Sequence, residues 1–457
     1  MNKKLLKALG CILATTVVAT SFAACAPESS EDPAPPAKRT HDQITHVVTG
    51  SETGETRHHN FVDGKCTMCD ETTIFRQDAM YKSPEILLTE QPEEEQGTIE
   101  WFWYKTRAYG VEEFAKDGVG KNGKEFVSAN GKEYNGEELW IWKRAYVYLP
   151  AGYDPDDTTK KYNVMYMMHG DKLNEGYWFA KSAYEMEQNK SAYTNGYGTE
   201  NMLDYMHANG LAEDTIYLGI TMYQYYTGEP KTEEERDDNS TLVGGNDIQG
   251  NYYSGYIDAE DRVDFDFGIG ENGEGKDAVI WKEWKYHLMP YVVAHYNTYA
   301  EVPEGFELPV DGLTEENADF FKACEEARDH VAYTGLSRGG GSVRSIMTNA
   351  LEYCSYFAYE STGVPDKATI DNINAKKDTY PTRYIFISSG SMEGPEKTDA
   401  SMLEVRDALG WTQNEGSDIA GGDRICYLQV NGTAHNYATW ITNLYNFSLV
   451  AFKGPTD

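Results

Sequence analysis

The chain has 457 residues, which is long enough for one large domain with appendages or for two domains. Hydrophobic residues make up 40% and aromatic residues 13%, so the chain can build a sizeable core and is not disordered overall. Its formal net charge of −34 repels phosphate backbones and anionic surfaces, which argues against nucleic-acid binding.

Residues 1–24 have the pattern of a secretory signal peptide. Three lysines precede a mostly apolar run, residues 8–18, that is too short for a stable membrane span. The segment ends Phe22-Ala23-Ala24-Cys25, which resembles a bacterial lipobox, with Phe22 where Leu is usual. The resemblance implies cleavage before Cys25, lipidation of its thiol and an extracytoplasmic protein anchored to the cell membrane. The alternative is ordinary secretion, with Cys25 as a chance residue near the cleavage point.

Residues 25–57 are rich in Glu, Pro, Ser and Thr and contain few apolar residues. This composition is typical of a flexible, solvated linker. It would give the domain that follows some reach from the membrane.

Residues 58–72 differ from the linker, because they contain an aromatic residue, a glycine turn and two thiols. The thiols have the spacing of a metal knuckle, and nearby histidines could complete a structural zinc site. The candidate ligands are Cys66, Cys69, His46 and His58 or His59. A disulfide between the two cysteines is an equal alternative, since the exterior of the cell is oxidising. Three other cysteines are expected to be buried thiols: Cys324, Cys354 and Cys426.

Residues 97–457 alternate short apolar runs with stretches of helical length. The expected strands are Trp140–Leu149, Val164–Met168, Thr215–Thr221, Val331–Leu336, Tyr384–Ser388 and Ile425–Val430. The expected helices are Trp281–Tyr299, with a kink or boundary at Pro290, Ser342–Leu351 and Tyr437–Phe452. This alternation predicts an α/β domain with a mostly parallel sheet covered by helices on both faces. Residues 224–276 lack clear periodicity and form a long insertion, which is usually functional or disordered.

The strongest chemical signal is the string Gly335-Leu336-Ser337-Arg338-Gly339. It has the pattern G-x-S-x-G and stands between an expected strand and an expected helix. A serine on such a sharp strand-to-helix turn needs small neighbours, and the helix that follows offers unpaired amides to a developing oxyanion. The context predicts that Ser337 is a nucleophile; a chance glycine-rich loop is the alternative.

A serine hydroxyl needs a general base and an acid that orients the base. Only one of the ten histidines, His435, follows the serine; it stands in a short loop between the last expected strand and helix. The order serine, acid, histidine is that of α/β-hydrolases. Glu393 follows the preceding strand and is the expected acid, with Glu396 and Asp399 as alternatives.

Two backbone amides should stabilise the oxyanion. One is expected from Arg338, and the other from Gly170 or Asp171, in the loop after Val164–Met168. His169, in the same loop, is expected to be structural rather than a second base.

Six motifs in order resemble carbohydrate esterase family one, which includes bacterial feruloyl and acetylxylan esterases. They are YVYLPAGYD, VMYMMHGD, the segment around Met289-Pro290-Tyr291, GLSRGGG, FISSGSMEG and GTAHNYATW. The resemblance implies the α/β-hydrolase fold and the roles given above for Ser337, His435 and the oxyanion amides, although the family usually has Asp where Glu393 stands. Trp178 and Trp440 resemble aromatic residues that line the family's substrate cleft, and core packing is the equal alternative.

The resulting hypothesis is a secreted serine esterase that removes feruloyl or acetyl groups from plant polysaccharide without a cofactor. One alternative is an esterase for a siderophore or another small ester. Another is a non-catalytic, carbohydrate-binding surface lipoprotein on a hydrolase scaffold.

Overall fold

One eight-stranded sheet organises the part of the chain that contains the predicted hydrolase. The computed structural model describes residues 90–109, 112, 138, 140–170, 173, 175–179, 198–222, 279–393, 396–411, 424–430 and 432–452, together with short strands between residues 45 and 66. The strand order is β12-β11-β10-β9-β7-β8-β6-β5. In chain order the strands are β5 (Thr98–Arg107), β6 (Trp140–Leu149), β7 (Asn163–Met168), β8 (Thr215–Ile220), β9 (Val331–Leu336), β10 (Tyr356–Glu360), β11 (Tyr384–Gly390) and β12 (Ile425–Val430).

Six neighbouring strands of this sheet are parallel, from β8 through β7, β9, β10 and β11 to β12. The other two are antiparallel: β6 pairs with β8, and β5 pairs with β6 at the edge. The parallel strands are buried on both faces, which explains why they are continuous apolar runs.

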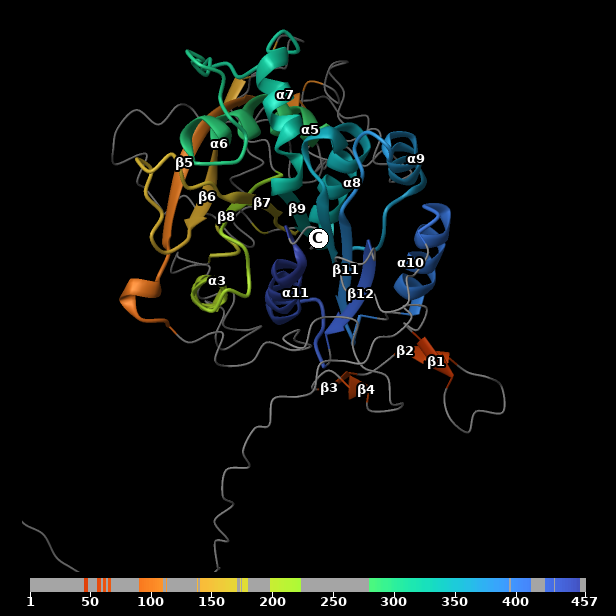
Figure 1. Cartoon of the computed structure of the whole chain (residues 1–457). Coiled ribbons are helices and arrows are strands. Elements are labelled where there is room, and N and C mark those ends of the chain that lie inside the picture. Colours follow the sequence, from red (N-terminus) through yellow and green to blue (C-terminus); the bar gives the residue numbers. More distant parts are fainter. Residues whose placement is uncertain are drawn as a thin grey trace, which may run out of the picture. The chain divides into compact units, whose positions relative to one another are not determined.

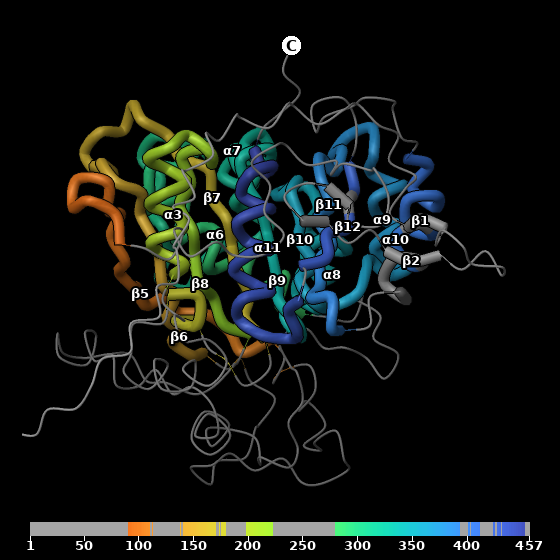
Figure 2. Tube along the Cα trace, turned by 90° about the horizontal axis from the view of Figure 1, so that it is seen from below, coloured from red at the N-terminus to blue at the C-terminus, as the bar shows by residue number. Residues whose placement is uncertain are grey.

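Alternate side chains of these strands enter two separate cores. On β7, Val164, Tyr166 and Met168 belong to one core, while Met165 and Met167 belong to the other. The second core is closed by α3 (Gly198–Ala208) and α11 (Tyr437–Val450), which contact each other across one face of the sheet (Figure 2).

The opposite face is covered by more helices (Figure 1). They are α5 (Ile280–Glu283), η8 (Trp284–Leu288), α6 (Met289–His295), α7 (Ala318–Glu326), α8 (Gly340–Asn349), α9 (Lys367–Lys376) and α10 (Glu396–Ala408). The predicted α/β fold, with a mostly parallel sheet and helices on both faces, is confirmed. The strand order, with the serine turn after β9, is that of an α/β-hydrolase.

The sequence located most elements but not all of them. The six expected strands are all present, and those at Trp140–Leu149, Val331–Leu336 and Ile425–Val430 have the expected bounds. The stretch around Pro290 is continuous helical backbone in which a π-helical turn, η8, joins α5 to α6, and Pro290 lies in the first turn of α6. Strands β5 and β10 and helices α3, α7, α9 and α10 were not predicted.

Several features predicted from the sequence lie wholly or partly outside what the structure describes. This holds for the signal segment, Cys25, Cys69 and the insertion at 224–276. His46, His58 and Cys66 fall on short antiparallel strands, β1 (Thr45–Val47) with β2 (Thr56–His58) and β3 (Phe61–Val62) with β4 (Lys65–Cys66), of which only the backbone is described. Among the described residues, no cluster of metal-ligating side chains occurs and no helix is long and apolar enough to cross a membrane. Cys324 and Cys354 are buried free thiols, as predicted.

A carboxyl group is buried in the sheet beside the serine turn. Glu360 ends β10, where it pairs in register with Leu336, and its side chain is fully buried. Its Oε1 accepts a hydrogen bond from Thr334 Oγ1 at 2.5 Å, and its Oε2 has no partner. Burial raises the pKa of Glu360 to about 8, although the bond from Thr334 opposes this shift. Glu360 is therefore mostly protonated at neutral pH.

We expect Glu360→Gln to change how stability depends on pH. Unfolded Glu360 loses its proton near its ordinary pKa, whereas the folded protein holds it up to about pH 8. Stability therefore falls between these values as pH rises, by up to about 1.4 kcal/mol per pH unit, and this fall is complete above the folded pKa. Urea unfolding of both proteins from pH 5 to pH 8 should show the variant gaining relative to the wild type as pH rises. Parallel curves would contradict a protonated Glu360.

Candidate active site

Ser337 stands on a strained turn between β9 and α8. Its φ of 50° lies in the left-handed region, which is uncommon for a residue with a side chain. The neighbouring glycines make the turn possible: a Cβ at Gly335 would lie 2.2 Å from the Gly339 carbonyl oxygen, and one at Gly339 would lie 2.5 Å from that of His169. The G-x-S-x-G string is therefore used as a turn that presents its serine at the carboxyl end of a central strand.

The structure brings Ser337, His435 and Glu393 together. His435 lies in the loop between β12 and α11, and its Nε2 is 2.8 Å from Ser337 Oγ. Its Nδ1 is 2.6 Å from Glu393 Oε2, so Nδ1–H donates to the carboxylate and Nε2 faces the serine hydroxyl. Glu393, the expected acid, thus bonds His435, while the side chains of the alternatives Glu396 and Asp399 lie outside what the structure describes.

Backbone hydrogen bonds join the loops that carry Glu393 and His435. Ser391 N–H donates to the Val430 carbonyl at 2.9 Å, and Met392 N–H donates to the Thr433 carbonyl at the same distance. A Cβ at Gly390 would lie 2.5 Å from that Thr433 oxygen, so the strand end and the histidine loop are in close contact. The acid and the base are therefore fixed relative to each other by their own backbones.

The carboxylate of Glu393 accepts three hydrogen bonds. Oε2 accepts from His435, while Oε1 accepts from the Gly390 amide at 2.7 Å and from Ser361 Oγ at 2.8 Å. Burial favours a raised pKa, but these three donors together outweigh it and hold the pKa of Glu393 below its ordinary value. The group is thus kept as a carboxylate that can stabilise an imidazolium.

Ser361 is a site residue that the sequence analysis missed. It follows β10 with φ 55°, donates to Glu393 and accepts a hydrogen bond of 3.1 Å from Trp440 Nε1. The Trp440 ring also packs edge-on against His435, with ring centroids 5.1 Å apart, and it is only 6% exposed. Trp440 thus touches the site by supporting its histidine and its acid, and the packing alternative describes it better than a place in a substrate cleft.

The expected oxyanion loop lies directly beside the nucleophile. A Cβ at Gly170 would be 3.1 Å from Ser337 Cβ and 2.6 Å from Leu336 Cδ1, so any side chain there would press on the nucleophile and on Leu336. Arg338 is the second residue of the η10 turn (Ser337–Gly339) that leads into α8. Asp171 lies outside the described residues. Gly170 and Arg338 therefore both lie next to Ser337, and their role as oxyanion amides stays a prediction.

Buried polar contacts hold this loop. His169 is fully buried; its Nδ1–H donates to the Gly170 carbonyl at 2.7 Å, and its Nε2 accepts from Thr221 Oγ1 at 2.8 Å. Lys143 Nζ donates to the Thr221 carbonyl at 2.8 Å and forms an ion pair of 2.7 Å with Glu283. The expectation that His169 has a structural role agrees with these contacts, since both ring nitrogens are engaged away from Ser337.

Trp178 does not line a cleft. Its side chain is fully buried in the core beneath α3 and α11, where its ring packs against Tyr177. The expectation of a substrate-lining role for Trp178 is therefore corrected to core packing, because a ring without exposed surface cannot meet a substrate. The large apolar content of this core explains the burial.

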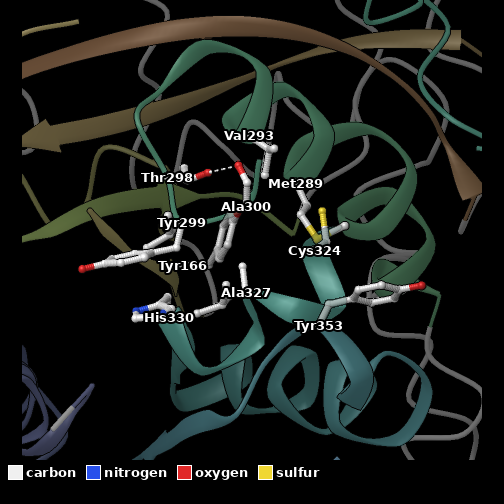
Figure 3. Close-up of a pocket in the computed structure, with 12 residues that line it drawn as sticks. Tyr166, Met289, Val293, Thr298, Tyr299, Ala300, Cys324, Ala327, His330 and Tyr353 are labelled. Carbon is white, nitrogen blue, oxygen red and sulfur yellow. Dashed lines mark hydrogen bonds between the residues drawn. The ribbon is translucent and has the colours of Figure 1, made fainter. Parts of the chain in front are cut away.

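A small cavity elsewhere in the domain is not a substrate site. It lies beside α6 and α7 and is lined by apolar and aromatic side chains, including Tyr166 and Cys324 (Figure 3). Val331 also lines it. Val331 begins β9, whereas Ser337 follows the other end of that strand. The volume of about 20 Å³ holds at most one water molecule. The cavity is a packing defect at the amino end of the sheet.

Comparisons with known proteins relate this chain to part of a larger one. No family model matches the chain. The chain is 25% identical to endo-1,4-beta-xylanase Y of Acetivibrio thermocellus over 259 residues. This alignment covers 54% of this chain but only 16% of that relative. The chain thus spans about a sixth of the relative's length.

Solved structures of esterases are among those similar to this one. The feruloyl esterase module from Clostridium thermocellum has 20% identity and a TM-score of 0.49 over 83% of this chain and 95% of that chain. The ferulic acid esterase from Anaeromyces mucronatus has 16% identity and a TM-score of 0.42 over 82% and 98%. The S-formylglutathione hydrolase from Staphylococcus aureus has 9% identity and a TM-score of 0.36 over 79% and 99%.

We expect Ser361→Ala to weaken the site without unfolding it. The change removes one of three donors to Glu393, and a hydrogen bond to a charged group contributes about 1.5–3 kcal/mol. Turnover of p-nitrophenyl acetate should fall by roughly tenfold or more, less than the loss caused by Glu393→Gln. Ser355→Ala is the matched control, because Ser355 stands at the other end of the same strand and bonds the Arg328 carbonyl. Equal activity of the two serine variants would show that Ser361 does not support the acid.

Proposed function

We propose that this protein is a serine carboxylic-ester hydrolase that works through an acyl-enzyme. The observation that carries the proposal is the continuous hydrogen-bonded chain from Ser337 through His435 to Glu393, at 2.8 and 2.6 Å, on a strained turn. A serine with a purely structural role would not need a strained left-handed backbone. It would also not need a hydroxyl that is hydrogen-bonded to an exposed histidine.

The proposed first half-reaction forms the acyl-enzyme. Ser337 Oγ attacks the ester carbonyl while its proton passes to His435 Nε2, and the amides of Arg338 and of Gly170 or Asp171 bind the resulting oxyanion. Glu393 stays ionised and stabilises the imidazolium through Nδ1–H. The tetrahedral intermediate collapses as His435 Nε2 gives its proton to the departing alcohol.

The second half-reaction returns the enzyme to its starting state. A water molecule gives a proton to His435 Nε2 and attacks the acyl carbonyl. The new intermediate releases the carboxylic acid as Ser337 Oγ takes the proton back. The mechanism requires no cofactor.

The proposed substrate is an ester-substituted plant polysaccharide, with feruloyl or acetyl groups on xylan. Two observations support this class: the similarity to a protein named as a xylanase, and the six motifs that resemble those of carbohydrate esterase family one. A siderophore or another small ester is the second candidate, and the same triad would serve it. The aligned hydroxyl, imidazole and carboxylate favour either over a non-catalytic binding protein.

We expect Ser337→Ala to lower ester turnover by several orders of magnitude. The measurement uses p-nitrophenyl acetate, methyl ferulate and feruloylated xylan with the wild type and the variant. A serine-reactive phosphonate should label the wild type at Ser337 and leave the variant unlabelled. Near-normal turnover by Ser337→Ala would exclude this mechanism, whereas wild-type turnover restricted to the smallest ester would exclude the polysaccharide.

We also propose that the protein is held outside the cytoplasm by lipid on Cys25, with residues 25–57 as a tether and with a zinc ion or a disulfide at Cys66 and Cys69. The support is the sequence pattern: a basic start, an apolar run, small residues before Cys25 and a linker after it.

We expect Cys25→Ser to move the protein from the membrane fraction to the soluble fraction. Stable anchoring requires more than one acyl chain, which a lipidated N-terminal cysteine would supply. Specific activity on p-nitrophenyl acetate should not change. Mass spectrometry of the wild type should show an N-terminus at Cys25 that carries diacylglycerol; an unmodified Cys25 would leave a freely secreted enzyme.

A further inference from the structure

An open cleft lies at the edge of the sheet, away from the serine. Its volume is about 530 Å³, within the range of small-ligand sites. It lies between the start of β5, the turn that follows β6 and the end of α6. Its most prominent lining residues are Glu100, Phe102, Tyr153, Tyr291, His295 and Tyr296. We propose that this cleft is a second binding site for a neutral oligosaccharide segment.

Aromatic rings form one wall of the cleft. Phe102 and Tyr291 are stacked with centroids 4.3 Å apart, and Tyr291 and His295 are stacked at 4.0 Å. Phe102 is buried, Tyr291 is partly exposed and His295 is exposed, so the stack extends from the core to the solvent. Rings with an apolar body and a polar tip suit ligands that have apolar faces and polar edges. The C–H face of a sugar ring beside its hydroxyl groups is such a surface.

Two polar side chains of the cleft, Glu100 and His295, offer hydrogen-bond acceptors. Glu100 is exposed, and among the described residues no cation pairs with its carboxylate, which accepts a long hydrogen bond of 3.3 Å from Tyr296 Oη. His295 donates through Nδ1 to the Tyr291 carbonyl at 2.8 Å, which leaves Nε2 as an acceptor when the ring is neutral. Sugar hydroxyls are the donors that such groups bind.

Charge selects against acidic ligands. The described residues that line the cleft include no lysine or arginine, and the whole chain carries −34. A phosphate, a uronic acid or a nucleic acid would meet repulsion from Glu100. A neutral, polyhydroxylated ligand fits the cleft best.

The cleft and the triad lie at opposite ends of the sheet. Leu149, which lines the cleft, ends β6 one residue after Tyr148, and Tyr148 pairs with Tyr217 near the start of β8. Ser337 follows the carboxyl end of β9, which runs parallel to β7 and β8. Six residues of strand span about 20 Å, so a ligand in the cleft does not reach the triad. The cleft would hold polymer independently of ester cleavage.

The test measures sugar binding with the triad blocked. Wild-type protein whose Ser337 carries a phosphonate is titrated with xylohexaose by calorimetry and is also bound to insoluble xylan. The double variant Glu100→Gln with His295→Ala should weaken xylohexaose binding at least fivefold and reduce retention on xylan. Tyr299→Ala is the matched control, because Tyr299 is an exposed ring stacked on a histidine at the same end of the sheet, outside the cleft.

Each outcome decides the proposal. Unblocked double variant and control should hydrolyse p-nitrophenyl acetate like the wild type, which shows that both are folded. Undiminished binding by the double variant, or no xylohexaose binding by the blocked wild type, would overturn the second site. If the double variant loses turnover, Tyr291→Phe replaces it in the binding test. This change removes only a phenol hydroxyl from the cleft, and the same weakening of xylohexaose binding is then required. Sugar binding without any ester turnover would instead count against the proposed esterase and leave the cleft in place.

Discussion

The left-handed backbone at Ser337 is the constraint on which the rest of the site depends. Such a conformation costs of the order of 1–2 kcal/mol for a residue with a side chain, so the surrounding structure must hold it. Gly335 and Gly339 allow the turn to fold back on itself, and Gly339 lies against the carbonyl of His169. A Cβ at Gly340 would lie 2.1 Å from the Thr362 side chain, so the start of α8 also presses on the loop after β10. The turn that carries Ser337 is thus in close contact with two loops, the one after β7 at His169 and the one after β10 at Thr362. These contacts help to hold its strained backbone.

Two buried ion pairs start from neighbouring residues of β6, and the Lys143 pair is connected to the Gly170 loop through Thr221 and His169. Lys143 and Glu283 are buried together, and Arg144 pairs with buried Glu175 at 3.2 Å. Burying such pairs adds little net stability, but removing one partner leaves an uncompensated charge. We therefore expect these pairs to act mainly by holding the backbone segments that they connect in fixed positions. Lys143 bonds the Thr221 carbonyl just before the 224–276 insertion and Glu283 just after it, so one side chain holds the chain on both sides of that insertion.

The sequence predicted the parts of the fold that have a strong local signal. Strands such as Val331–Leu336 are buried on both faces and stand out as apolar runs, and chain order alone located His435 and Glu393 relative to Ser337. Strand β5 was missed because, at the edge, it alternates buried and exposed side chains and contains charged residues. Strand β10 was missed because it is only five residues long. Ser361 had no signal at all, since its contact with Glu393 joins residues 32 apart.

The use of glutamate as the acid follows from the shape of its turn. Glu393 N–H donates to the Gly390 carbonyl at 3.1 Å, and the Gly390 amide donates back to Glu393 Oε1 at 2.7 Å, so the side chain folds over its own turn. With one oxygen held there and by Ser361, the other oxygen faces His435. An aspartate is one methylene shorter, by about 1.5 Å, and from the same backbone it would reach His435 or the Gly390 and Ser361 donors, but not both sets. Ser361 therefore supplies a donor to one oxygen of the carboxylate, while the longer glutamate side chain presents the other oxygen to His435.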